Sequence, residues 1–249
     1  MKMTNNQQVE EENSILNRWT VYFIELRVII FKSLAILLLV FAILYSYSAK
    51  IYNLLALPLI KHLKINLIAT HLTSTFIAPL KLCLVLSLVI SMPLILQQLW
   101  SFIAPGLYRQ EKFKSRLLLL LSIILFYLGL CFCYFIVLPI ITAFLIHIAP
   151  PGINVTPDIS AYLDFSLSLF LAFGLSFEIP ILIIILVLAN LVSISSFEQK
   201  RPYMIVLSFI IAMFLTPPDV FSQILLAIPM WILFEIGLLI AKILQKKSC

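Results

Sequence analysis

Three glutamates occupy places in this sequence where a carboxylate is unusual. Glu25 and Glu111 lie just before long apolar runs, and Glu178 lies inside one. A carboxylate at the edge of an apolar region can bind a cationic ligand through charge-assisted hydrogen bonds, and arginine fits such a site best. A carboxylate within a bilayer costs about 2.5–3.5 kcal/mol, so it normally faces protein or water. Pro180 predicts a helix kink beside Glu178 that frees a backbone carbonyl.

Each of these carboxylates also has a structural alternative. Glu25 could pair with Arg27, and Glu111 could pair with Arg109 or Lys112. The third glutamate could make a structural hydrogen bond. These alternatives predict a role in stability rather than in ligand binding.

The remaining acidic residues are explained more simply. Asp219 follows a proline pair, a position typical of a turn or a helix cap. Glu235 is expected to pair with Lys242, and Glu198 is expected to be a solvated surface group.

Motifs of enzymes and of cofactor sites are absent from the sequence. There is no glycine-rich phosphate loop, no HExxH and no GxSxG, and the chain has five glycines in total. Three histidines and four cysteines lack the spacing of metal ligands, and the cysteines are interpreted as packing residues. We therefore expect no catalytic residue, no cofactor and no metal.

The composition indicates a membrane protein. Of 249 residues, 63% are hydrophobic and 11% are charged, less than half the charged fraction of a typical soluble domain. Residues 117–157 contain no charged side chain. The net charge of +6 is spread over the ends of apolar segments, so we expect a lipid bilayer as partner and no nucleic acid.

Six apolar segments can be read as helices. They are 28–47, 76–96, 117–138, 165–189, 204–215 and 220–241. The fifth, bounded by Pro202 and by a proline pair, covers only about 18 Å of a hydrocarbon core of about 30 Å. Pro229 predicts a kink in the sixth. The sequence predicts an all-α membrane protein with six transmembrane helices and a short, kinked final hairpin.

The distribution of lysine and arginine predicts the topology. Basic residues flank the chain ends and the connections between spans two and three and between spans four and five, which favours cytoplasmic placement of both termini. Residues 1–27 are predicted to form a mobile tail and an interfacial helix, 28–241 the six-span domain, and 242–249 a cytoplasmic tail.

Five strings of residues resemble the TatC family of the twin-arginine protein translocase. They are IELR at 24–27, WSFIAPGLY at 100–108 followed by Glu111, FGLSFEIP at 173–180, KRPY at 200–203, and TPPDVFSQ at 216–223 continuing to AIPM at 227–230. The chain departs from the pattern at Tyr22-Phe23, where many relatives have His-Leu, so any role of that histidine does not carry over.

The resemblance implies a receptor for the signal peptides of folded precursors. Glu25 and Glu111 would bind the arginine pair at the cytoplasmic face of a bacterial inner membrane. The rest of this signal-peptide site consists of Arg27, Phe102, Pro105 and Leu107.

The resemblance also implies partners and an energy source. The chain would work with TatA and TatB in an oligomer driven by the protonmotive force. Glu178, with Pro180, would line a concave face within the membrane. Residues for partner docking or for structure are Pro58, Met213, Thr216, Asp219 and Gln223.

Two other functions remain open at this point. Glu178 and the broken helices could belong to a proton- or ion-coupled transporter, which predicts inverted repeats that the sequence does not show. An intramembrane hydrolase would need paired aspartates or a Ser/His pair at one depth, whereas Asp158, Asp164 and Asp219 all fall at the outer boundary.

Overall fold

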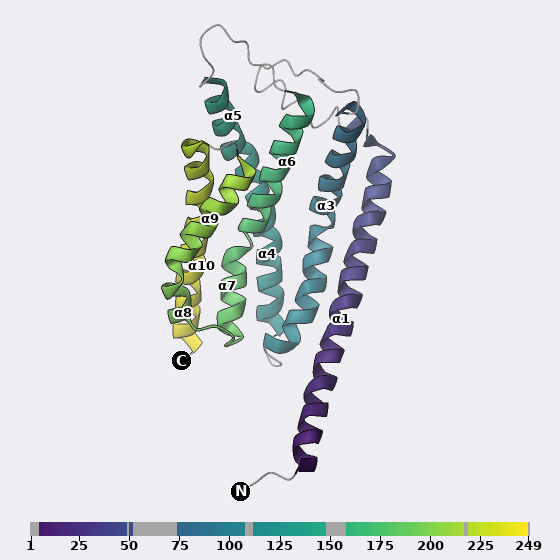
Figure 1. Cartoon of the computed structure of the whole chain (residues 1–249), viewed down its shortest axis with the longest axis vertical. Coiled ribbons are helices and arrows are strands. Elements are labelled where there is room, and N and C mark those ends of the chain that lie inside the picture. Colours follow the sequence, from purple (N-terminus) through teal and green to yellow (C-terminus); the bar gives the residue numbers. More distant parts are fainter. Residues whose placement is uncertain are drawn as a thin grey trace.

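The computed structural model describes residues 5–48, 50–51, 74–107, 112–147, 158–216 and 219–248. Side chains are described except at 5–23, 74–75, 102–107, 112–115, 145–147, 159 and 247–248. Within these ranges the regular structure is helical, and the helices form an upright bundle (Figure 1). α1 begins and α10 ends at the same end of the bundle, called the inner end below.

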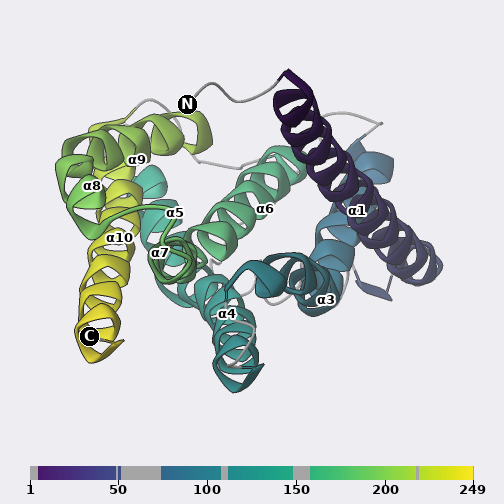
Figure 2. The ribbon, with the colours of Figure 1, turned by 90° about the horizontal axis from the view of Figure 1, so that it is seen from below.

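α1 (Asn5–Tyr45) and α3 (Ser74–Leu107) form one side of the bundle. α1 is unbroken from its polar start, so no break separates the expected interfacial helix from the first span at residue 27. The segment expected to be a mobile tail is helical from Asn5, because its glutamates and glutamines are strong helix formers. α1 packs chiefly on α3 and lies at the rim of the bundle (Figure 2).

The third span is longer than predicted because a π-helical turn lies within it. α4 (Lys112–Phe132) continues through η1 (Cys133–Val137) into α5 (Leu138–His147). In η1 the Leu138 N–H donates to the Cys133 carbonyl, five residues back. This wider turn lies directly before Pro139, which would clash with the preceding turn of a regular α-helix.

The fourth span is divided, as Pro180 predicts. α6 (Ile159–Ser176) ends just before Phe177 and Glu178, and α7 (Ile179–Leu188) begins directly after them. Pro180 lies in the first turn of α7, where its missing N–H leaves no hydrogen bond unmade.

The final hairpin is formed by α9 (Arg201–Leu215) and α10 (Val220–Ser248), and α8 (Ile194–Gln199) precedes it. α9 has 15 residues, about 22 Å, so it is the short helix that the sequence predicted. It begins three residues earlier than expected, because Pro202 starts the helix rather than ending the previous segment. α10 is one helix through Pro229.

Close helix contacts are made at glycines. A Cβ on Gly129 of α4 would lie 2.8 Å from the carbonyl oxygen of Phe173 in α6. A Cβ on Gly237 of α10 would lie 2.7 Å from Cα of Pro180 in α7. These contacts place α4 and α10 on either side of the divided fourth span, as membrane helices that approach through small residues do.

The predicted fold class is confirmed. Within the part of the chain that the structure describes, five helical segments are long and apolar enough to cross a membrane, namely Ile24–Tyr45, Phe76–Ser101, Arg116–Phe144, Ser160–Leu188 and Val220–Lys246. The shorter apolar helix Arg201–Leu215 completes the set of six.

Candidate functional site

The inner part of α1 carries an exposed carboxylate. Glu25 is exposed, and it makes no ion pair with any residue whose side chain the structure describes. Arg27 does not pair with it, because residues two apart point to different faces of a helix. The Arg27 guanidinium lies over the Phe31 ring instead, 5.5 Å from its centroid.

Two polar contacts define the register of α1 against α3. The Ser33 hydroxyl donates to the Gln98 side-chain oxygen at 2.8 Å, and the Cys83 thiol contacts the Leu44 carbonyl at 3.8 Å. The two helices are therefore antiparallel. Counting eight residues back from Ser33 reaches Glu25, and counting eight forward from Gln98 reaches Gly106. Glu25 is thus level with the inner end of α3.

The predicted companions of Glu25 belong to this end of α3. Phe102, Pro105 and Leu107 lie in its last two turns, where the structure describes the backbone and not the side chains. Glu111 and Pro58 lie outside the described residues. The prediction that Glu25 and Glu111 lie together and bind one arginine pair therefore stays a prediction.

Glu178 lies at the break between α6 and α7 and is 8% exposed. Its Oε2 accepts a hydrogen bond from the Ser122 hydroxyl of α4 at 2.5 Å. Its Oε1 is buried without a hydrogen-bond partner among the described residues. This is the structural hydrogen bond left open by the sequence, and it places the carboxylate between helices rather than towards lipid. Ser122 was not predicted as its partner.

At the tip of the final hairpin, polar residues cap helices. Asp219 Oδ2 accepts from the Ser222 backbone N–H at 2.7 Å, so its predicted role as a helix cap is confirmed. The buried Thr216 hydroxyl donates to the Ala212 carbonyl at 2.9 Å, at the end of α9.

Other residues predicted in this hairpin are more accessible. Met213 of α9 is exposed, and Gln223 of α10 is half-buried. The buried residues of α9 are Ser208 and Ala212, which lie one turn apart on the same face of the helix. Arg201, Met204 and Leu215 are half-buried, and the other side chains of α9 are exposed and available for contact with lipid or another protein.

Two ion pairs at the inner end differ from the sequence prediction. Glu235 does not pair with Lys242. It binds Arg201 through both oxygens, at 2.9 Å to Nε and 3.0 Å to Nη2, and so connects α10 to the start of α9. Lys242 pairs with Glu198 of α8. The sequence missed both pairs because it did not predict α8 or the start of α9.

Metal ligands do not cluster in the part of the chain that the structure describes. No group of three His, Cys, Asp or Glu side chains there could hold an ion. The polar groups of the described residues are suited to hydrogen bonding and charge recognition.

Comparison with known proteins identifies the family. Residues 22–229 match the family described as Sec-independent protein translocase protein (TatC). A protein of that name from Azotobacter chroococcum is 47% identical over 86% of this chain and 84% of its own length. The Haemophilus influenzae protein is 46% identical over 91% and 90%.

Solved structures agree with this match. A crystal structure described as the twin arginine translocase receptor TatC superimposes with a TM-score of 0.81 at 35% identity. The match covers 89% of this chain and 98% of that one. These relatives favour protein translocation over an ion-coupled transporter or a hydrolase. The chain belongs to the TatC family of Sec-independent protein translocase proteins.

Proposed function

We propose that this chain is the receptor of a twin-arginine translocase and binds the signal peptides of folded precursors at its inner end. Glu25 and Glu111 hold the arginine pair, and the last turns of α3, with Phe102, Pro105 and Leu107, form the neighbouring surface. The supporting observation is that Glu25 is exposed, unpaired among the described side chains, and level with the inner end of α3.

Arginine suits this site better than lysine. Its planar guanidinium donates two parallel hydrogen bonds to a carboxylate, and it loses its hydration more readily than an ammonium group does. Each charge-assisted contact contributes about 1.5–3 kcal/mol, so neutralising one glutamate weakens binding about 10- to 100-fold.

The inner end faces the cytoplasm in this proposal, with both termini there, and the membrane is a bacterial inner membrane. The supporting observation is the charge of the described residues at that end. These are Arg27, Lys32, Arg116, Lys200, Arg201, Lys242 and Lys246. Cytoplasmic ends of membrane proteins are enriched in such residues.

The binding experiment compares twin-arginine and twin-lysine peptides. Titrations with the purified complex use the wild type, Glu25→Gln, Glu111→Gln and, as a control, Glu198→Gln on α8. We expect the first two variants to lose affinity and discrimination, and the control to keep both. Unchanged discrimination in Glu25→Gln and Glu111→Gln would remove these carboxylates from the site.

The same proposal assigns TatA and TatB as partners, in an oligomer driven by the protonmotive force. α9 is the candidate docking helix, because its surface is largely exposed and its length leaves it short of a full crossing. A short helix thins the bilayer locally, which lowers the barrier to moving polar cargo. Photocrosslinking from Met213 tests docking, with Leu39 on α1 as the control position.

Glu178 is proposed to act in transport rather than in signal-peptide binding. Its buried Oε1 has no partner among the described residues, so it can accept a hydrogen bond from water or from a moving chain. Glu178→Ala is expected to reduce export while leaving peptide affinity unchanged. Wild-type export by this variant would reduce the residue to a dispensable hydrogen bond.

A further inference from the structure

An apolar groove of about 260 Å³ opens between α3, α4 and α6, in the half of the bundle away from the chain termini. Its walls include Val85 of α3, Cys131 of α4, Phe135 of η1, and Leu167 of α6. Val85 and Leu167 are buried, whereas Cys131 is exposed and Phe135 is 71% exposed. The groove therefore has a closed floor and an open side within the membrane-spanning segments, where acyl chains replace water.

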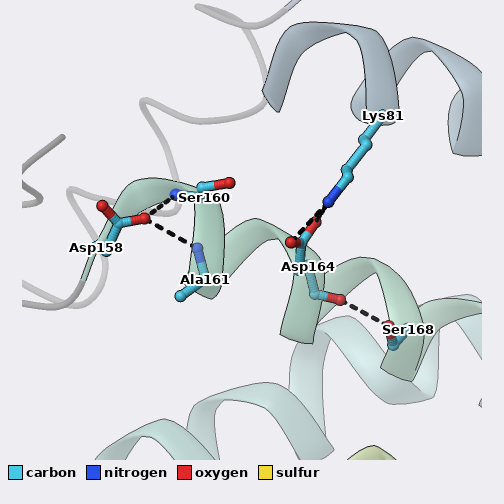
Figure 3. A network of polar contacts seen from close by, with 6 residues as sticks. All are labelled: Lys81, Asp158, Ser160, Ala161, Asp164 and Ser168. Carbon is cyan, nitrogen blue, oxygen red and sulfur yellow. Dashed lines mark hydrogen bonds and ion pairs between the residues drawn. The ribbon is translucent and has the colours of Figure 1, made fainter. Parts of the chain in front are cut away.

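An ion pair lies at the outer end of this groove. Lys81 Nζ of α3 is 2.7 and 2.8 Å from the two carboxylate oxygens of Asp164 in α6 (Figure 3). Lys81 and Val85 are four residues apart and Asp164 and Leu167 three apart, so each charge is about one turn above a wall of the groove. Both charged side chains are 44% exposed.

The ion pair keeps unused hydrogen-bonding capacity. An ammonium has three N–H donors, and two contacts of the Lys81 ammonium go to Asp164. A carboxylate has about four acceptor sites, and Lys81 occupies two of those on Asp164. The nearby Asp158 caps the start of α6 instead, because its Oδ1 accepts hydrogen bonds from the backbone N–H groups of Ser160 and Ala161 (Figure 3). The third N–H of the Lys81 ammonium and the remaining acceptor sites of the Asp164 carboxylate therefore lie side by side at the rim of the groove.

We infer that this groove and its ion pair bind one phospholipid whose head group carries both a phosphate and a primary ammonium. An acyl chain fills the groove, the phosphate accepts a hydrogen bond from Lys81, and the lipid ammonium donates to Asp164. A trimethylated head group has no N–H to donate. An anionic head group without an amine leaves Asp164 opposed by negative charge. The site therefore selects phosphatidylethanolamine over phosphatidylcholine.

Native mass spectrometry tests this inference on the full chain, equilibrated with equal amounts of phosphatidylethanolamine and phosphatidylcholine in detergent. We expect the wild type to retain one phosphatidylethanolamine after partial delipidation. Equal retention of the two lipids, or retention of neither, would overturn the head-group assignment.

The groove can be blocked in the folded protein, which avoids any effect of a mutation on folding. Among the described cysteines Cys131 is exposed and Cys83 and Cys133 are buried, so a bulky maleimide on a Cys249→Ser variant attaches at Cys131. The control carries the same label at Leu128→Cys, with Cys131 and Cys249 replaced by serine. Leu128 is exposed on α4 and does not line the groove.

We expect the label at Cys131 to abolish retention of the lipid and the control label to preserve it. Retention by both labelled proteins would exclude the groove. If the Cys131 label leaves the lipid in place and instead displaces a bound signal peptide, the occupant is a peptide and the inference fails.

A double variant separates the head-group contact from the acyl-chain contact. Lys81→Gln with Asp164→Asn removes both charges together and leaves neither one unpaired. We expect this protein to retain one lipid but to take phosphatidylethanolamine and phosphatidylcholine equally. If the double variant still preferred phosphatidylethanolamine, the ion pair would not be what distinguishes the two head groups.

Discussion

α1 and the α6–α7 pair are almost equally apolar and have opposite surroundings. Their spans have mean hydropathies of 2.7 and 2.6. In the most apolar 18-residue stretch of each span, however, 6% of the residues are buried within the chain in the first span and 56% in the fourth. Among the described helices α1 packs chiefly on α3, whereas α6 packs on α3 and α4 and α7 packs chiefly on α10. Hydropathy therefore identifies segments that tolerate a bilayer, and it does not distinguish a lipid neighbour from a protein neighbour.

Small and polar residues distinguish helix surfaces that face protein from those that face lipid better than hydropathy does. The buried fourth span contains Gly174, and its partner helices contribute Gly129 and Gly237 at points of close approach. Helices in a membrane gain little from exchanging lipid for apolar side chains, so close backbone contact and hydrogen bonds decide which surfaces associate. The stability of the chain should therefore depend on α6–α7 far more than on α1.

The largest expected effect is the loss of a buried ring. Phe173 of α6 is 0% exposed and lies 5.6 Å from the Phe132 ring, whereas Phe31 of α1 is 58% exposed. Phe173→Ala should lower the free energy of unfolding by about 3–5 kcal/mol because it leaves a cavity. Phe31→Ala should change it by less than about 0.5 kcal/mol. Unfolding in mixed micelles measures both, and equal losses would contradict the comparison.

An added methyl group should have the next largest effect. Alanine is normally favoured over glycine in a helix by about 1 kcal/mol. At Gly237 the new Cβ would lie 2.7 Å from a backbone atom of Pro180, so Gly237→Ala should destabilise the chain by about 1–3 kcal/mol. Ala35→Val, which adds two methyl groups on the exposed face of α1, should cost no more than the lower helix propensity of valine, less than about 0.7 kcal/mol. A stabilised Gly237→Ala variant would show that α7 and α10 separate easily.

Replacing one serine in each region compares the strength of their interhelical hydrogen bonds. Ser122→Ala removes the donor to Glu178, and Ser33→Ala removes the donor to Gln98 between α1 and α3. Interhelical hydrogen bonds in membranes average about 0.6 kcal/mol and reach about 1.7. We expect the loss in Ser122→Ala to be near the upper value, because it leaves a buried carboxylate oxygen unpaired, and the loss in Ser33→Ala near the average. A double-mutant cycle with Glu178→Ala, which removes the acceptor, isolates the first bond, and a coupling near zero would argue against it.

The smallest effect should come from the exposed pair at the inner end. The Lys242 ammonium lowers the pKa of the Glu198 carboxyl below its ordinary value of 4.5 by hydrogen bonding and charge. The charged carboxyl is thus favoured in the folded chain, so the pair stabilises it at neutral pH. This contribution is lost as the pH falls from about 4.5 through the lowered pKa. Melting temperatures of wild type and Glu198→Gln should differ slightly at pH 7 and converge in acid.

The sequence located the six apolar helices because each carries a long run that charges interrupt at its ends. Their limits were less predictable where proline is involved. Pro202, expected to bound the fifth apolar segment, lies in the first turn of α9, and Pro139 lies within a helix that the π-helical turn keeps continuous. Proline excludes one local hydrogen bond, and whether a helix ends there depends on how the preceding turn is arranged.

The candidate site was predictable in composition and not in geometry. The position of Glu178 beside Pro180 predicted a polar group at a break, which the structure contains. Its partner Ser122 lies 56 residues earlier, and no local pattern connects the two. The level of Glu25 against α3 likewise depends on the register of two helices, which follows from packing. Salt bridges at the inner end were mispaired for the same reason.

The π-helical turn at Cys133–Val137 has a consequence for sequence alignment and engineering. Such a turn holds one residue more than the α-helical turn it replaces, so the span contains a built-in insertion. Each residue rotates an α-helix by about 100°, so the same residues wound as a regular α-helix, without the wide turn, would rotate all of α5 by about that angle relative to α4. Ile141 and Thr142, now buried, would then turn away from the core. A relative that aligns without a gap around Pro139 but has a regular α-helix there must therefore place a different face of its outermost two turns inward. A relative that is one residue shorter in this turn would keep the same face inward.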